Sequence, residues 1–129
     1  MVDEASVYLE KAEGSLAGAA DELGNGRYNN CANRCYYAAF LAAVSALVAA
    51  GIQPVGRAGK WGHEFVWAQF VGVLINSRKL YPAELRDTFE RLYRLREVAD
   101  YQPDRITAVQ ASRAVRRATD VVAAVRARR

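Results

Sequence analysis

The order of apolar and polar residues predicts helices along most of the chain, with one of them at its centre. From Tyr28 to Ala50 the sequence contains no Gly or Pro and, after Arg34, no charged residue. A helix at the surface of a bundle needs a polar stripe that faces water, so this run predicts a helix buried on every side. Its first two turns differ, because a polar line runs along them. The line has the spacing i, i+3, i+4 and i+7 and consists of Asn30, Asn33, Arg34 and Tyr37. Such a line indicates either hydrogen bonds between helices or the wall of a site.

Further helices are predicted on both sides of this one. Apolar residues keep helical spacing from Asp3, a plausible N-cap, to Leu23, and the turn at residues 24–26 places this first helix antiparallel to the central one. The remaining helices are expected at residues 63–76, at residues 82–101, and from about Asp104 or Thr107 to residue 125. Pro82 is expected at the first position of the fourth helix, and Pro103 is expected to stop it.

Residues 51–62 (GIQPVGRAGKWG) predict the longest loop, because Gly and Pro prevent regular structure there. Arg57, Lys60 and Trp61 would give this loop charge and a stacking face. The sequence shows no strand pattern and no internal repeat. It therefore predicts an all-α fold, an antiparallel five-helix bundle that forms a single domain over residues 1–129.

The charge is uneven along the chain. Among 129 residues the net charge is +4, and residues 1–77 hold 5 basic and 7 acidic side chains, whereas residues 78–129 hold 13 basic and 7 acidic ones. The positive excess in the C-terminal part suits an anionic partner, such as nucleic acid or an acidic protein. A basic terminal helix also serves solubility, so charge alone leaves both explanations open.

The long apolar helix raises the question of a membrane span. Its first third contains three Asn and one Arg, and Ala contributes little to insertion. Asp3 and Glu4 stand where a signal peptide would have basic residues, and no apolar core follows them. We expect a soluble, cytoplasmic protein without a membrane segment.

Arg96 is the most informative charged residue. A helical wheel puts Arg86, Arg91 and Arg94 on or near the outward side of the fourth helix, but it puts Arg96 on the apolar stripe of Leu85, Phe89, Leu92 and Ala99. A buried guanidinium group needs partners, and Asp100 at i+4 and the polar line of the central helix can supply them. The alternative to a functional site is a plain buried Arg–Asp pair that fixes the helix register.

Three pieces of the sequence resemble a known family: residues 25–40 (NGRYNNCANRCYYAAF), His63 at the start of a helix, and residues 96–101 (REVADY) followed at once by a break. Together they resemble the HEPN domain (higher eukaryotes and prokaryotes nucleotide-binding), and more narrowly the small stand-alone prokaryotic HEPN proteins with an R-x-x-A-D-Y motif. The resemblance covers residues 3–125. It implies a four-helix up-and-down core plus an additional helix, a homodimer with the motif arginines near the two-fold axis, and frequent pairing with a minimal nucleotidyltransferase as toxin and antitoxin. Family members with an R-x4–6-H motif are metal-independent ribonucleases.

This sequence departs from that catalytic motif, because no His follows Arg96 within six residues. Metal-free RNA cleavage needs a group that accepts the 2′-hydroxyl proton and a group that stabilises the phosphate. Arg96 suits the second task. Asp100 would be a weak base, because a carboxylate paired with arginine is stabilised in its charged form. His63 is the single His of the chain, and it could equally be a residue at the edge of the core.

The candidate site therefore has two parts. Its candidate catalytic residues are Arg96, Asp100 and Tyr101, and its candidate binding wall is Asn30, Asn33, Arg34, Tyr37 and His63. Cys31 and Cys35, one helical turn apart, could suggest zinc together with His63, but no second pair completes a ligand set. We expect no metal, no disulfide and no cofactor, since the sequence also lacks a phosphate loop and a dinucleotide fingerprint.

Two functions from different classes remain open. The first is a HEPN protein that handles RNA or nucleotides as a toxin-type, metal-independent ribonuclease, which the polar wall favours. The second is a non-catalytic module that binds a nucleotidyltransferase partner, with Arg96 and Asp100 as a structural pair, which the missing motif His favours. In either case we expect a homodimer, because five helices of this length leave an apolar strip uncovered.

Overall fold

The computed structural model describes residues 3–54 and 59–129, and within these ranges the chain forms helices and no strand. The α-helices are α1 (Glu4–Gly24), α2 (Tyr28–Ala49), α3 (His63–Gln69), α4 (Thr88–Tyr101) and α5 (Ala108–Ala127). A π-helical segment, η1 (Phe70–Ser77), continues α3, and a short 3-10 turn, η2 (Ala83–Arg86), precedes α4. The prediction of an all-α five-helix bundle is confirmed.

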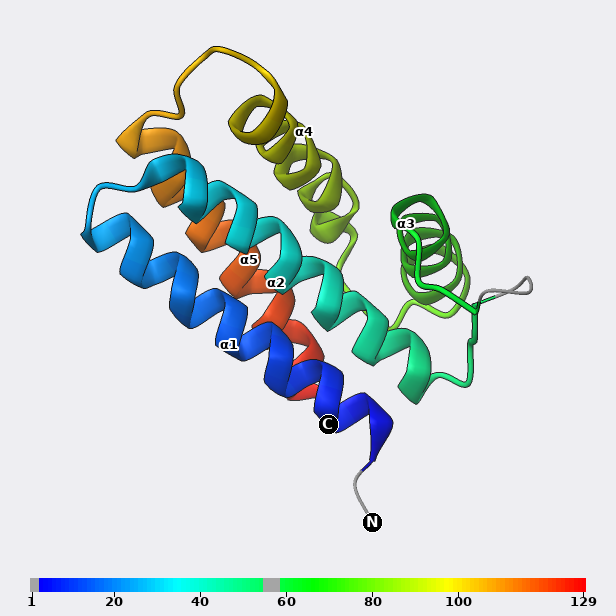
Figure 1. Cartoon of the computed structure of the whole chain (residues 1–129). Helices are drawn as coiled ribbons and strands as arrows, with labels where there is room; N and C mark the ends of the chain where they lie inside the picture. The colour runs from blue at the N-terminus through cyan, green and yellow to red at the C-terminus, as the bar shows by residue number, and fades with distance from the viewer. Residues whose placement is uncertain (1–2, 55–58) are drawn as a thin grey trace.

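The four long helices form an up-and-down core around α2 (Figure 1). α2 lies beside α1, runs antiparallel to it, and also contacts α4 and α5. α3 and η1 are set apart from these four helices and pack against the part of the molecule near the C-terminal half of α2. α2 is therefore the element that positions the others.

Small side chains allow the neighbours of α2 to pack closely. Ala38, Ala39, Ala42 and Ala43 are fully buried, and Leu47 and Ser45 continue this buried surface toward the end of the helix. The Ser45 hydroxyl donates a 2.6 Å hydrogen bond to the carbonyl of Ala5 in α1, so the one polar group in this stretch has a partner. The predicted burial on every side holds for most of this half of α2 but not for Ala49, which is exposed, and in the first half Asn30, Arg34 and Tyr37 are exposed.

By length and composition α2 would also be long and apolar enough to cross a membrane. Most of its apolar window, 67%, is buried inside the bundle. A core helix of a soluble protein gives the same pattern, and the surrounding helices already cover this one.

One expected helix boundary differs from the sequence prediction. Pro82 does not open the fourth α-helix but precedes the 3-10 turn η2, and α4 begins only at Thr88. Leu85 is buried within that turn, and Arg86 Nε donates a 2.8 Å hydrogen bond to Asn76 Oδ1, so contacts with the preceding segment hold the turn in place. The last helix begins after Thr107, whose side chain caps it in a reciprocal arrangement with Gln110. Arg57 of the predicted loop lies outside the described residues.

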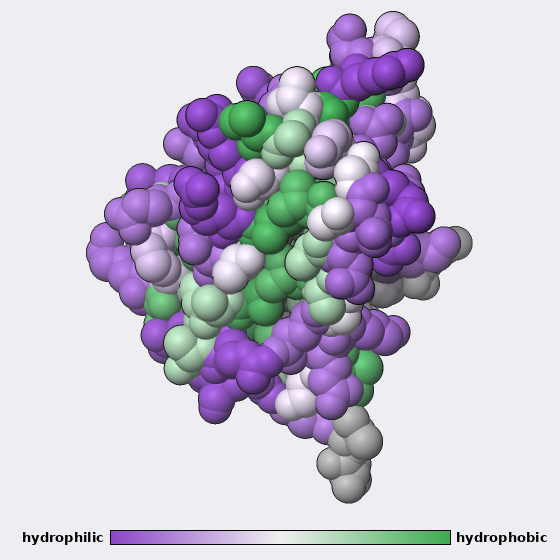
Figure 2. All heavy atoms as spheres, turned by 90° about the vertical axis from the view of Figure 1, so that its left-hand side faces the viewer, coloured by the Kyte–Doolittle hydropathy of each residue, from purple (hydrophilic) through white to green (hydrophobic). Residues whose placement is uncertain are grey.

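An apolar surface remains on the outside of the bundle. A groove of about 510 Å³ lies between α1 and α5, and its walls include Leu16, Ala20, Val115 and Val122. Figure 2, which looks at the left-hand side of Figure 1, shows a band of hydrophobic side chains between hydrophilic flanks. The chain itself therefore leaves an apolar strip uncovered, as the sequence predicts.

The close packing of α2 gives the first prediction. Ala42→Leu inserts three carbon atoms into a fully buried position and should lower the free energy of unfolding by about 1–3 kcal/mol. Ala49→Leu makes the same change at an exposed position of the same helix and should alter stability by less than about 0.5 kcal/mol. Urea denaturation of both variants measures the difference. Equal stability of the two variants would contradict the assignment of α2 as the packed centre.

Candidate functional site

Arg96 extends from the inner face of α4 toward α2. Its side chain is 17% exposed, and its Nε lies 3.3 Å from Asp100 Oδ2. The Nη2 group donates a 3.4 Å hydrogen bond to the hydroxyl of Tyr37 on α2. The contact between Nε and Asp100 has the geometry of an ion pair and not of a hydrogen bond, so Nε has no hydrogen-bond partner among the described residues. The predicted burial of Arg96 and its two predicted partners are confirmed.

Tyrosine rings surround the guanidinium group. Its central carbon lies 5.1 Å from the ring centre of Tyr36, 5.4 Å from that of Tyr37 and 5.9 Å from that of Tyr101. Attraction between the cation and the ring faces offsets part of the cost of burying the charge. Burial disfavours the charged form of Arg96, but Tyr37, Tyr101 and Asp100 outweigh this effect and raise its pKa. Arg96 is therefore a permanent positive charge held by aromatic side chains.

His63 joins this cluster through Tyr36. His63 is the first residue of α3, and its Nδ1 lies 2.6 Å from the Tyr36 hydroxyl, while its ring stacks on Tyr93 with 3.9 Å between ring centres. Burial lowers the pKa of His63, although Glu90 and Glu64 oppose the shift. Burial also raises the pKa of Tyr36 well above its ordinary value. At neutral pH the pair is therefore an uncharged imidazole hydrogen-bonded to an uncharged phenol.

The predicted polar line lies along the wall of a second feature, an open hollow of about 500 Å³ between α1, α2 and the end of α4. Its wall consists of Ser15, Asn30, Asn33, Arg34, Tyr37 and Asp100. Asn33 Nδ2 donates a 2.9 Å hydrogen bond to Asp100 Oδ2, the same oxygen that pairs with Arg96. Asp100 therefore ties α4 to α2. Asn30 instead donates to Glu22 Oε2 at 2.9 Å, so its amide is engaged with α1.

Arg34 crosses from α2 to α1 at a glycine. A Cβ atom added to Gly18 would come within 3.0 Å of Arg34 Nη1 and 3.3 Å of its Cδ, so the missing side chain makes room for the arginine. Ser15 lies on α1, one turn before Gly18, and its hydroxyl donates a 2.8 Å hydrogen bond to the carbonyl of Arg34. These contacts set the α1 side of the hollow.

The structure brings together the four residues of the polar line with Asp100, and it places Arg96 behind Tyr37 and Asp100. It does not place His63 in the wall of this hollow, since His63 reaches the Arg96 cluster from α3. Tyr101 is 69% exposed, with its ring beside the guanidinium group. Sequence reasoning missed Tyr36 and Tyr93. Tyr93 stands one helical turn before Arg96, and this i, i−3 spacing is the signal that could have found it.

Cys31 and Cys35 are both buried, with their sulfur atoms 4.0 Å apart. Within residues 3–54 and 59–129, no group of three or more His, Cys, Asp or Glu side chains is close enough to hold a metal ion. The chemistry that the described cluster offers is therefore that of a fixed cation, aromatic faces and one titratable imidazole.

Comparison with known families decides what kind of domain this is. The family model described as HEPN domain matches residues 5–128, which is nearly the whole chain. The chain belongs to the HEPN domain family. No curated protein matches this HEPN chain. Among solved structures, the crystal structure of TT1696 from Thermus thermophilus is similar, with a TM-score of 0.78, 22% sequence identity and 98% of each chain covered. At this identity the similarity concerns the fold.

The buried His63 gives the second prediction. Because its pKa is lowered in the folded protein, the unfolded chain takes up this proton first as the pH falls, and the free energy of unfolding should decrease as the pH drops through about 6.5. His63→Gln should remove this part of the pH dependence. As the chain contains one His, its proton NMR titration is unambiguous. A His63 pKa at or above 6.5 would contradict the burial described above.

Proposed function

We propose that this HEPN protein cleaves RNA without a metal ion and is the toxin-type component of a pair with a minimal nucleotidyltransferase. The observation that carries the proposal is the chain of contacts from Arg96 to the ring of Tyr36 and from the Tyr36 hydroxyl to His63. It supplies a phosphate-binding cation and a neutral imidazole in one cluster, although the sequence lacks a His in the Arg96 motif.

The proposed reaction divides the work between these residues. With Nδ1 of His63 donating to the Tyr36 oxygen, Nε2 keeps its lone pair and accepts the proton of a ribose 2′-hydroxyl. The 2′-oxygen then bonds to phosphorus while the bond to the 5′-oxygen breaks. The 5′-oxygen takes up a proton from water, and the His63 imidazolium releases its proton to water. The products are a 2′,3′-cyclic phosphate end and a 5′-hydroxyl end. Arg96 stabilises the negative charge on the phosphate oxygens during the exchange.

The other predicted site residues receive supporting roles in this proposal. Asp100 accepts from Asn33 and pairs with Arg96, so it orients the guanidinium group and does not act as the base. The exposed ring of Tyr101 offers a face on which an RNA base can stack. Arg34 and the amides of Asn30 and Asn33 would line the path of the flanking nucleotides.

A second function is supported by the same Asp100 contacts. Asp100 joins α4 to α2 through Arg96 and Asn33, which is what a purely structural ion pair would do. In that case the protein is a non-catalytic module that binds its nucleotidyltransferase partner. Activity of matched variants separates the two functions.

The third prediction concerns cleavage of RNA in EDTA. Arg96→Lys keeps the positive charge but loses the planar fork that grips a phosphate, and it should lower the rate by about 10²-fold or more. His63→Gln should lower it by about 10²-fold or more through loss of the proton acceptor. Arg94→Lys is the matched control, because Arg94 is exposed on the same helix and pairs with Glu90. Its rate should stay within about twofold of the wild type.

Product analysis should reveal 2′,3′-cyclic phosphate ends, and thermal melting of each variant checks that it is folded. If the wild type leaves RNA intact at high concentration and instead co-purifies with a nucleotidyltransferase, the catalytic proposal fails and the interaction module stands. Loss of activity in Arg94→Lys equal to that in Arg96→Lys would show that cleavage does not depend specifically on the guanidinium group of Arg96.

The fourth prediction is a homodimer with the Arg96 clusters near its two-fold axis. Tyr101 and Tyr37 are 69% and 40% exposed, and both flank Arg96, so large aromatic surfaces lie uncovered beside the buried cation. Sedimentation at micromolar concentration should show a dimer, and Tyr101→Asp should weaken it. Val109→Asp places the same charge at an exposed apolar residue elsewhere and serves as the control. A wild-type monomer, or equal effects of both variants, would contradict this arrangement.

A further inference from the structure

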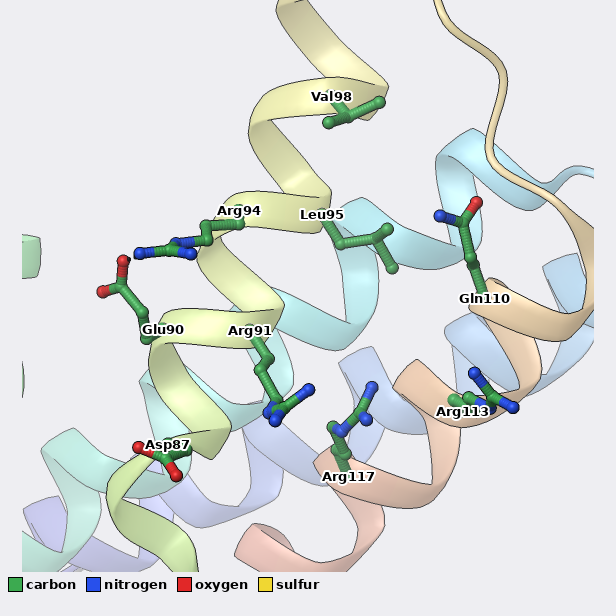
Figure 3. Close-up of a pocket in the computed structure, with 9 residues that line it drawn as sticks. All are labelled: Asp87, Glu90, Arg91, Arg94, Leu95, Val98, Gln110, Arg113 and Arg117. Atoms are coloured by element: carbon green, nitrogen blue, oxygen red, sulfur yellow. Dashed lines mark hydrogen bonds and ion pairs between the residues drawn. The ribbon is translucent and has the colours of Figure 1, made fainter.

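A second set of arginines faces a cleft on another side of α4. The cleft lies between α4 and α5, has a volume of about 630 Å³, and does not include Arg96 among its walls. Arg91 and Arg94 come from α4, and Arg113 and Arg117 come from α5. In Figure 3 the side chains of Arg91 and Arg117 point toward each other across the gap, and Arg113 lies on the same side of α5 as Arg117.

Acidic side chains do not neutralise this group. Glu90 is paired with Arg94 at 2.9 Å, at the outer side of α4 in Figure 3. Asp87 lies at the end of the cleft away from Arg113 and Gln110. Among the residues that the structure describes, Arg91, Arg113 and Arg117 form no ion pair with a carboxylate. Three guanidinium groups therefore share one cleft without an ion-paired carboxylate among the described residues.

The surroundings in the cleft disfavour the positive charge of Arg117. Burial lowers the pKa of Arg117, and the neighbouring Arg91 and Arg113 lower it further. Like charges that are brought together from two helices repel one another unless an anion lies between them. The arrangement thus fits a ligand with negative charge concentrated in a small volume.

The other residues that line the cleft indicate which chemical groups the ligand carries besides its negative charge. Leu95 and Val98 form an apolar floor on α4, and Gln110 adds an amide at the start of α5. Guanidinium groups grip the oxygens of a phosphate through paired N–H donors, and an apolar floor accepts the face of a base or a sugar. An acidic peptide carries its carboxylates on separate side chains, so it would place less negative charge between the three guanidinium groups than a phosphate does.

We propose that this cleft between α4 and α5 binds the phosphate groups of a nucleotide or of RNA, with Arg91, Arg113 and Arg117 as the phosphate ligands. The site is separate from the Arg96 cluster, because Arg96 faces α2 whereas these arginines line the cleft between α4 and α5. It therefore does not require Arg96 to be catalytic.

The test uses pyrophosphate, ATP and a short single-stranded RNA as probes, each titrated against the full chain in phosphate-free buffer of low ionic strength. Calorimetry follows the first two probes and fluorescence anisotropy follows the labelled RNA. Arg113→Ala and Arg117→Ala should each weaken binding by about tenfold or more, and for RNA each should reduce the salt slope by about 1. Tighter binding of ATP would identify a free nucleotide as the ligand, and tighter binding of RNA would identify its backbone.

One control variant and the choice of probe make the result specific. Arg116→Ala removes the same charge from an exposed position on the same helix, outside the cleft, and should bind the probes within about twofold of the wild type. Cleavage tests the catalytic proposal, whereas binding of pyrophosphate, which has no ribose to cleave, tests this one, so failure of the two proposals is distinguishable. The inference is overturned if no probe binds saturably, or if Arg116→Ala weakens binding as much as Arg113→Ala does.

Discussion

The burial of α2 is the constraint on which the rest of the structure depends. Its alanines bring α1, α4 and α5 to within close packing distance, and side chains this small leave no room for a polar group without a partner. Apart from Ser45, whose hydroxyl is hydrogen-bonded to Ala5, the polar residues of α2 lie in its first turns, where the bundle opens to solvent. The candidate site lies there because several polar side chains can be exposed in this stretch of the central helix without disturbing the packing.

Arg96 shows how the bundle accommodates a charge at the edge of this core. The guanidinium group is neither fully solvated nor neutralised by a single carboxylate, because three tyrosine rings and Asp100 share the task. These aromatic contacts leave one N–H donor without a hydrogen-bond partner among the described residues. A cation held in this way has a fixed orientation, and its unpartnered Nε is buried and not open to solvent.

The sequence was sufficient for the helices and for Arg96, but not for the contacts around it. Periodicity identifies which face of a helix is apolar, so the burial of Arg96 and its pairing with Asp100 follow from local spacing. The contact between His63 and Tyr36 joins residues 27 positions apart, and it depends on how α3 crosses α2, which spacing does not encode. The delayed start of α4 has a similar cause, because tertiary contacts of Leu85 and Arg86 override the local preference of Pro82.

Gly18 has a consequence for the hollow although it belongs to none of its walls. A methyl group at residue 18 would meet only the far end of Arg34, a flexible side chain that can swing aside without disturbing the backbone. The displaced guanidinium group would then shift relative to Asn33 and Asp100. A substitution of Gly18 on α1 would thus change the position of the positive charge in the hollow, although every residue that lines the hollow stays the same. Natural variation at this single glycine would retune the electrostatics of the hollow while leaving the fold as it is.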